Sequence, residues 1–116
     1  MFERNVLRGE VYVTDLSAHG GRLAKVRPAL VVQNDRGNFA SPETIVLGIR
    51  SAGPDKYLPI RVPVRRGVGG LMQDSFIDAG QILTLRKESL GTRVGKMPPE
   101  IMARVDQALR ISLGLS

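Results

Sequence analysis

Arg27 stands directly before Pro28 and an apolar run over residues 29–32, and this arrangement has the clearest chemical meaning in the sequence. Proline disfavours the helical region for the residue before it, so we expect Arg27 to be extended and its guanidinium to be aimed by a stiff backbone. A guanidinium makes forked hydrogen bonds to phosphate or carboxylate. Two interpretations are open: a strand-edge arginine that pairs with an acid, or a cation fixed beside an anion-binding site.

Arg50 and Ser51 end a predicted strand over residues 43–50. Apolar residues alternate along that strand, so Arg50 lies on the face opposite Ile49 and can point into a groove. Strand ends beside loops commonly carry functional groups. Ser51 is either an ordinary turn hydroxyl or a hydrogen-bond donor for a bound anion.

The other polar candidates each have an ordinary structural explanation. His19 lies in a loop of small residues, where a lone histidine is more often solvated than catalytic. Arg61 and Arg65 either contact phosphate or protect an exposed strand edge. Asp78 and Gln81 lie near the ends of predicted strands.

The chain offers few groups for catalysis, because it has one histidine and no cysteine. Disulfides, thiolate metal sites and most nucleophile and acid–base sets are therefore excluded, and we expect neither a metal ion nor a cofactor. Cleavage of RNA tolerates such a set, since the substrate brings its own nucleophile. The 2'-hydroxyl attacks the adjacent phosphorus, and the protein need only orient it and stabilise charge.

Charge and length indicate the number of domains and the kind of binding partner. The chain has 116 residues, with 17 Lys and Arg against 11 Asp and Glu and a net charge of +6. We expect one domain over residues 1–116 whose partners are polyanions. The longest apolar runs are too short to span a membrane, and the first residues lack a signal-peptide core, so we expect a cytoplasmic protein.

Period-two alternation and turn formers predict the elements that must position these groups. We expect strands over residues 8–16, 27–33, 43–50, 57–64, 74–79 and 81–87. Between them, residues 17–25, 34–42, 51–56 and 65–71 are expected to form loops and turns. Two prolines in the strand over residues 57–64 indicate a sheet edge, with Val62 and Val64 inward and Arg61 outward.

The C-terminal stretch changes period. Over residues 98–115 the apolar positions recur every three or four residues, which predicts an amphipathic helix that begins near Pro99 and stops at Gly114. Its predicted buried set is Ile101, Val105, Ala108, Leu109 and Leu113. Several short strands followed by one helix predict a mostly β (α+β) fold, a small barrel or curled sheet that packs against that helix.

The order of these segments resembles the MazF/PemK family of toxin–antitoxin endoribonucleases. The resemblance covers about residues 8–115, and its most specific parts are the opening "RGEVY" and the strand "RPALVVQND". It implies a small SH3-like barrel (CcdB/PemK-like) with a C-terminal helix, assembled as a homodimer. It also implies metal-independent, sequence-specific cleavage of single-stranded RNA (mRNA) to a 2',3'-cyclic phosphate and a 5'-hydroxyl, inhibited by a cognate antitoxin whose acidic segment fills the RNA groove.

Carried over residue by residue, Arg27 matches the family's catalytic arginine. The family's second residue is a threonine near the end of the third strand; here Arg50 takes that place and Ser51 follows, and we assign the catalytic hydroxyl to Ser51. Gln81 matches the family glutamine, but glycine precedes it where the family has an acid, and Asp78 is two residues away from that place. The expected RNA contacts are Arg50, Gln81, His19, Arg61, Arg65 and Asp78.

Two other functions compete with this interpretation. CcdB toxins resemble the fold but bind DNA gyrase without cutting nucleic acid; that contact uses a C-terminal tryptophan, and this chain has no tryptophan. The departures from the family pattern, with Arg50 in place of threonine, Gly80 in place of an acid and Leu83 in place of arginine, also allow a catalytically weakened RNA-binding member of the family. Mapping the ends of cut RNA separates all three.

Overall fold

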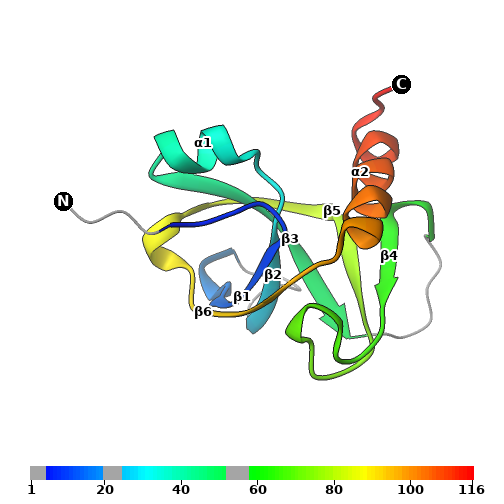
Figure 1. Ribbon diagram of the computed structural model, residues 1–116, viewed down its shortest axis with the longest axis horizontal. Coiled ribbons are helices and arrows are strands. Elements are labelled where there is room, and N and C mark those ends of the chain that lie inside the picture. The colour runs from blue at the N-terminus through cyan, green and yellow to red at the C-terminus, as the bar shows by residue number, and fades with distance from the viewer. Residues whose placement is uncertain (1–4, 20–24, 52–57) are drawn as a thin grey trace.

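The computed structural model describes residues 5–19, 25–51 and 58–116. Its six strands form one antiparallel sheet in the order β4-β5-β3-β2-β1-β6, curled into a half-barrel with α2 at its side (Figure 1). The strands are β1 Glu10–Asp15, β2 Val26–Val31, β3 Glu43–Ser51, β4 Arg61–Val64, β5 Ser75–Arg86 and β6 Thr92–Lys96. The predicted fold class, mostly β with a C-terminal helix, is confirmed.

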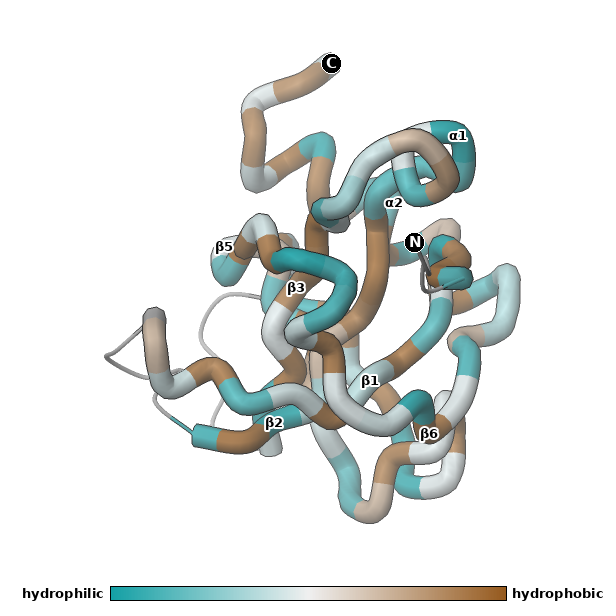
Figure 2. Tube along the Cα trace, turned by 90° about the vertical axis from the view of Figure 1, so that its left-hand side faces the viewer, coloured by the Kyte–Doolittle hydropathy of each residue, from teal (hydrophilic) through white to brown (hydrophobic). Residues whose placement is uncertain are grey.

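Apolar residues gather on both faces of the curled sheet. One cluster lies between the sheet and α2 and includes Leu30, Leu47 and Ile77. The other lies on the opposite face and includes Tyr12 and Val46. Figure 2 shows the matching alternation of hydrophobic and hydrophilic stretches along the trace. Because both faces are covered, the curl of the central strands is fixed from two sides.

The helix α2, Pro99–Leu113, confirms the prediction from the C-terminal period. It starts at proline and ends at Gly114, which has a left-handed φ of 71° that glycine adopts without strain. Its buried residues are Met102, Val105 and Ala108, while Leu113 is 55% exposed, so the prediction for Leu113 was wrong. No helix in the described part of the chain is long and apolar enough to cross a membrane.

Two elements were not predicted. The helix α1, Asp35–Ala40, stands where turn formers suggested a loop, because Asn34 caps it by accepting a hydrogen bond from the Gly37 amide at 2.8 Å. The strand β6 is polar and short, and it is formed through its pairing with β1.

The strand β5 is one strand, although Gly80 suggested a break between two. Its pairing with β3 shifts between Leu47, opposite Ile82, and Gly48, opposite Asp78. The residues in between form a bulge, so Gly80 bends the strand without ending it.

The predicted edge strand is shorter than expected. It begins at Arg61, after a single 3-10 turn η3 over Leu58–Ile60. Its place at the end of the strand order confirms the edge that its prolines indicated.

Arg8 ties the start of the chain to both helices. Its backbone amide donates to Asp35 at 2.6 Å, its Nε donates to the Val32 carbonyl at 2.8 Å, and its guanidinium pairs with Asp106. These contacts hold α1 and α2 against the N-terminal end of the sheet.

Candidate RNA-cleavage site

The site lies where β2 and β3 separate. Their pairing stops at Ala29 opposite Gly48, although the same register would set Arg27 opposite Arg50. Pro28 has no amide hydrogen to give to a ladder. Beyond this point, within the described residues, β2 pairs only with β1 and β3 pairs only with β5. The two arginines therefore lie at the same level on strands that part from each other.

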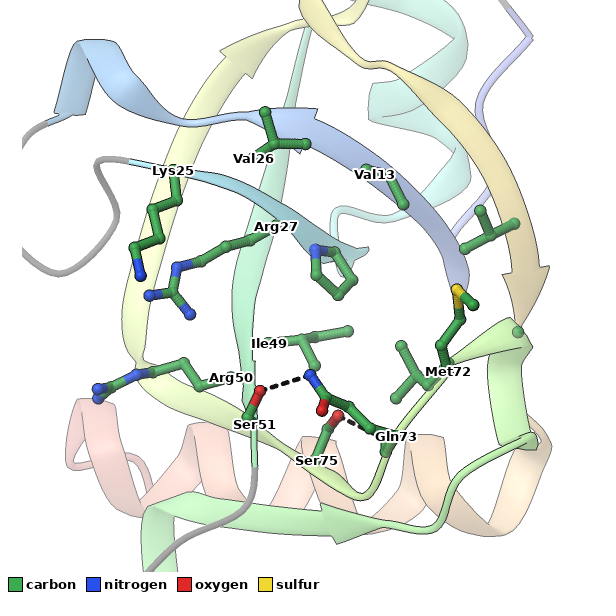
Figure 3. Close-up of a pocket in the computed structure, with 14 residues that line it drawn as sticks. Val13, Lys25, Val26, Arg27, Ile49, Arg50, Ser51, Met72, Gln73 and Ser75 are labelled. Atoms are coloured by element: carbon green, nitrogen blue, oxygen red, sulfur yellow. Dashed lines mark hydrogen bonds between the residues drawn. The ribbon is translucent and has the colours of Figure 1, made fainter.

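A hollow of about 540 Å³ opens between these strand ends, and we call it the β2–β3 hollow (Figure 3). Its lining comes from the five strands β1, β2, β3, β5 and β6, from Lys25 just before β2, and from the segment before β5. The lining residues are Val13, Lys25, Val26, Arg27, Pro28, Ile49, Arg50, Ser51, Gly70, Leu71, Met72, Gln73, Ser75 and Val94.

Among the described residues that line this hollow, the charged ones are all cations. Lys25, Arg27 and Arg50 extend toward the same side of it in Figure 3, and no described residue that lines it is acidic. Arg27 is half-buried, and its buried Nε has no hydrogen-bond partner within the described part of the chain. Because an unpaired buried donor is costly, this arrangement favours an anion as the missing partner over the strand-edge ion pair.

Hydroxyl and amide groups lie beside the cations. The Nε2 of Gln73 donates to the Oγ of Ser51 at 2.7 Å, and the Oγ of Ser75 donates to the Gln73 carbonyl at 2.8 Å. Ser51 lines the hollow with Arg27 and Arg50, so the structure brings these three candidate residues together, while the roles assigned to them stay predictions. The sequence analysis did not identify Gln73. The one feature of the sequence that could have indicated it is its position, as a polar residue close before a predicted strand.

Arg50 rests on an aromatic ring. Its guanidinium carbon lies 5.8 Å from the centre of Phe76, which is opposite it in the β3–β5 pairing. The guanidinium carbon of Arg61 lies 4.6 Å from the centre of the same ring. A phenyl face attracts a cation, so Phe76 steadies Arg50 at the edge of the hollow.

Comparison with known proteins gives the family. Residues 7–113 match the model of the PemK-like, MazF-like toxins of type II toxin–antitoxin systems. The endoribonuclease EndoA of Bacillus subtilis (strain 168) is 41% identical over 111 residues, which cover 95% of this chain and 96% of EndoA. The chain belongs to the MazF/PemK-like toxin family. The family predicted from the sequence is thus confirmed.

Solved structures agree with this assignment. An endoribonuclease from a mycobacterial species has a TM-score of 0.81 at 27% identity, with 99% of this chain and 97% of that chain covered. An endoribonuclease in complex with its cognate antitoxin, also mycobacterial, has a TM-score of 0.80 at 28% identity, with coverage of 96% and 97%. The fold of this MazF-like toxin is therefore that of its family.

Other residues that were predicted to contact RNA do not line the β2–β3 hollow. Asp78 is buried, with one carboxylate oxygen 3.9 Å from Arg61 Nε and the other accepting from the Gly80 amide at 2.8 Å. Arg61 lies on the face of β4 opposite the buried Val62 and Val64, as predicted, but its side chain is only 17% exposed, so it is mostly covered and not open to solvent. Gln81 is half-buried in the bulge of β5.

Arg65 lines a second hollow of about 570 Å³ between β4 and the first turns of α2, together with Asp74, Glu100 and Arg104. His19 ends a short 3-10 turn, Ser17–His19, and its side chain lies outside the described residues. Just before this turn, hydrogen bonds from Ser17 lower the pKa of Asp15. RNA contacts by Gln81, His19, Arg61 and Arg65 stay predictions, whereas the burial of Asp78 favours a structural role for it over the predicted RNA contact.

Glycines set the position of the segment that carries Gln73. The 3-10 turn η4, Val68–Gly70, crosses β6 so closely that a Cβ on Gly70 would lie 2.0 Å from the Val94 carbonyl oxygen. A Cβ on Gly95 would lie 2.4 Å from the Gly69 carbonyl. The stretch "GVGG" is therefore a close crossing of two backbones, in agreement with the predicted turn.

Proposed function

We infer that this toxin is an endoribonuclease, and we propose that it cuts single-stranded RNA by attack of the 2'-hydroxyl on the adjacent phosphorus. The observation that carries the proposal is a hollow lined by Lys25, Arg27 and Arg50 together with the hydroxyl of Ser51, and with no acidic lining residue among those described. A phosphodiester would bring to these cations a negative charge that the described lining residues do not supply. The endoribonuclease activity of EndoA, the relative at 41% identity, supports the same conclusion.

In the proposed reaction the protein stabilises charge while the RNA supplies the nucleophile. The 2'-oxygen loses its proton and bonds to phosphorus, the bond from phosphorus to the 5'-oxygen breaks, and that oxygen gains a proton. The products carry a 2',3'-cyclic phosphate and a 5'-hydroxyl. Arg27 donates to the oxygens where charge grows, because its buried Nε lacks any other partner among the described residues.

Ser51 and Arg50 take different roles in this proposal. Arg50 keeps its proton at all ordinary pH values, so it acts as a second phosphate cation. Ser51 gives its hydroxyl hydrogen to a phosphate oxygen. We expect no metal ion to take part, since the described lining residues offer no carboxylate, imidazole or thiol as a ligand.

The apolar part of the hollow suits an unpaired base. Val13, Pro28, Leu71 and Val94 line it beside the cations, and Met72, also in the lining, is 90% exposed. A base next to the cut phosphate can lie against this wall only when it is unstacked, which favours single-stranded RNA and recognition of a short sequence.

Partners follow from the same surface. One structural relative is solved in complex with its cognate antitoxin. We propose that a cognate antitoxin inhibits this chain by placing an acidic segment in the β2–β3 hollow, where carboxylates would pair with Arg27 and Arg50. A homodimer with RNA along a groove near the subunit interface, and a cytoplasmic location, stay part of the proposal.

The deciding experiment is end mapping on a long RNA. The purified protein is incubated with the RNA in EDTA, and we expect cuts at a short recurrent sequence with cyclic phosphate and 5'-hydroxyl ends. Arg27→Ala should lower the cleavage rate by a factor on the order of 10² to 10³.

Arg86→Ala is the matched control, because Arg86 is exposed and pairs with Glu88 away from the hollow. Intact RNA, or equal rates for the wild type and Arg27→Ala, would contradict the proposal; gyrase inhibition without cutting would support the CcdB-like alternative.

A further inference from the structure

We infer that Gln73 is a positioning residue that sets the direction of the Ser51 hydroxyl, an inference that rests on the proposed function. The two residues come from different elements, since Ser51 ends β3 and Gln73 precedes β5. Their side chains meet at 2.7 Å, with Gln73 Nε2 as the donor and Ser51 Oγ as the acceptor (Figure 3).

The direction of this hydrogen bond matters because a hydroxyl has one hydrogen to give. Accepting from Gln73 occupies a lone pair of Ser51 Oγ and leaves its hydrogen unused. The hydrogen must then point away from Gln73. Ser51 lines the hollow together with Arg27 and Arg50, so a phosphate bound by the arginines lies within the reach of this donor.

Ser75, the second serine that contacts Gln73, differs from Ser51 because its hydroxyl hydrogen is already used. Ser75 is 5% exposed, and its hydrogen is already given to the Gln73 carbonyl at 2.8 Å. That bond holds the backbone carbonyl of Gln73, while the side-chain amide is held by its bond to Ser51. Ser75 is thus part of the support, while Ser51 is the group prepared to donate.

Gln73→Met tests this inference, because methionine has nearly the same length and no amide. We expect single-turnover cleavage to slow by roughly tenfold, by analogy with other losses of positioned proton-handling groups. Affinity for RNA with a 2'-O-methyl group at the cut should stay unchanged. Gln107→Met is the matched control, since Gln107 is exposed on α2. In the Ser51→Ala background Gln73→Met should have no further effect.

Gln73→Glu gives a readout that a purely structural role would not move. An ionised carboxylate only accepts, so it would draw the Ser51 hydrogen toward itself and repel phosphate. A protonated carboxyl can donate as the amide does. The rate relative to the wild type should therefore rise as the pH falls from about 7 toward about 4.5, the range in which a glutamate side chain takes up its proton.

The outcomes separate this inference from the proposed function. A wild type that leaves RNA intact contradicts the proposed function, and the inference is then judged by NMR: the side-chain amide signals of Gln73 must shift in Ser51→Ala. If the wild type cuts RNA, three results would overturn the inference alone. The first is normal cleavage by Gln73→Met. The second is a cleavage rate of Gln73→Glu, relative to the wild type, that does not change with pH. The third is additive effects of Gln73→Met and Ser51→Ala.

Discussion

Arg50 and Phe76 stand opposite each other in the β3–β5 pairing, with the guanidinium carbon 5.8 Å from the ring centre. Phe76 is 6% exposed, and Arg50, which lies over its ring, also lines the hollow. The pairing therefore sets a buried aromatic ring against a cation of the site. A flexible arginine that is restrained in this way loses less entropy when it binds phosphate.

Phe76→Leu should therefore weaken RNA binding without removing any charge. An exposed cation–π contact contributes about 0.5–1 kcal/mol, which is roughly a two- to fivefold change in affinity. The measurement is RNA affinity at fixed salt, in the wild type and in the Arg50→Ala and Arg61→Ala backgrounds, because Arg61 lies over the same ring. If the effect passes through Arg50, Phe76→Leu should do little in the Arg50→Ala background and keep its effect in the Arg61→Ala background; the reverse result would contradict the role.

Ser51→Ala and Arg50→Ala should separate in kinetics. We expect Ser51→Ala to lower the single-turnover cleavage rate with little change in RNA affinity, because a hydroxyl acts only as charge develops. Arg50→Ala should weaken binding and reduce the salt slope by about one counterion. Titration of a 2'-O-methyl RNA at several salt concentrations, beside single-turnover rates, measures both. Normal cleavage by Ser51→Ala with slow cleavage by Arg50→Ala would assign the catalytic place to Arg50 instead.

Local sequence patterns predicted the two strand ends that form the site, but not the hydrogen bond between Gln73 and Ser51. The apolar run after Pro28 and the alternation before Arg50 predicted two strand ends, because burial imposes a period of two on a strand. The meeting of these ends required the sheet order, in which β2 and β3 are neighbours. Gln73 could not be predicted, since only the crossing of η4 over β6 brings it to Ser51.

The elements that were missed share a cause. Asn34 was interpreted as a turn former, but the same side chain that favours turns also caps a helix. Gly80 was interpreted as a strand end, but a bulge uses the same conformational freedom within a strand. In both cases a local signal has two structural outcomes, and contacts from distant parts of the chain select one.

Gly95→Ala should destabilise the protein and slow RNA cleavage together. The new methyl group would lie 2.4 Å from the Gly69 carbonyl, so η4 must move and carry Gln73 with it. Overpacking of this kind costs about 1–3 kcal/mol. Thermal unfolding and single-turnover rates measure the two effects. Gly114→Ala is the control, because a Cβ there meets nothing within 4 Å and its left-handed φ alone costs about 1 kcal/mol. Equal rates for Gly95→Ala and the wild type would show that η4 does not position the site.

Asp78→Asn should lower stability while leaving RNA affinity nearly unchanged, although the sequence suggested Asp78 as an RNA contact. Asp78 is 3% exposed and lies 3.9 Å from Arg61 Nε, outside the β2–β3 hollow. Asparagine keeps an oxygen for the Gly80 amide but removes the charge that faces Arg61. Weakening a buried charged contact costs about 1–3 kcal/mol, which urea unfolding will measure. RNA affinity is measured in parallel at low and high salt. Unchanged stability together with altered RNA binding would support Asp78 as an RNA contact after all. Removing the charge of a buried structural carboxylate should lower the free energy of unfolding.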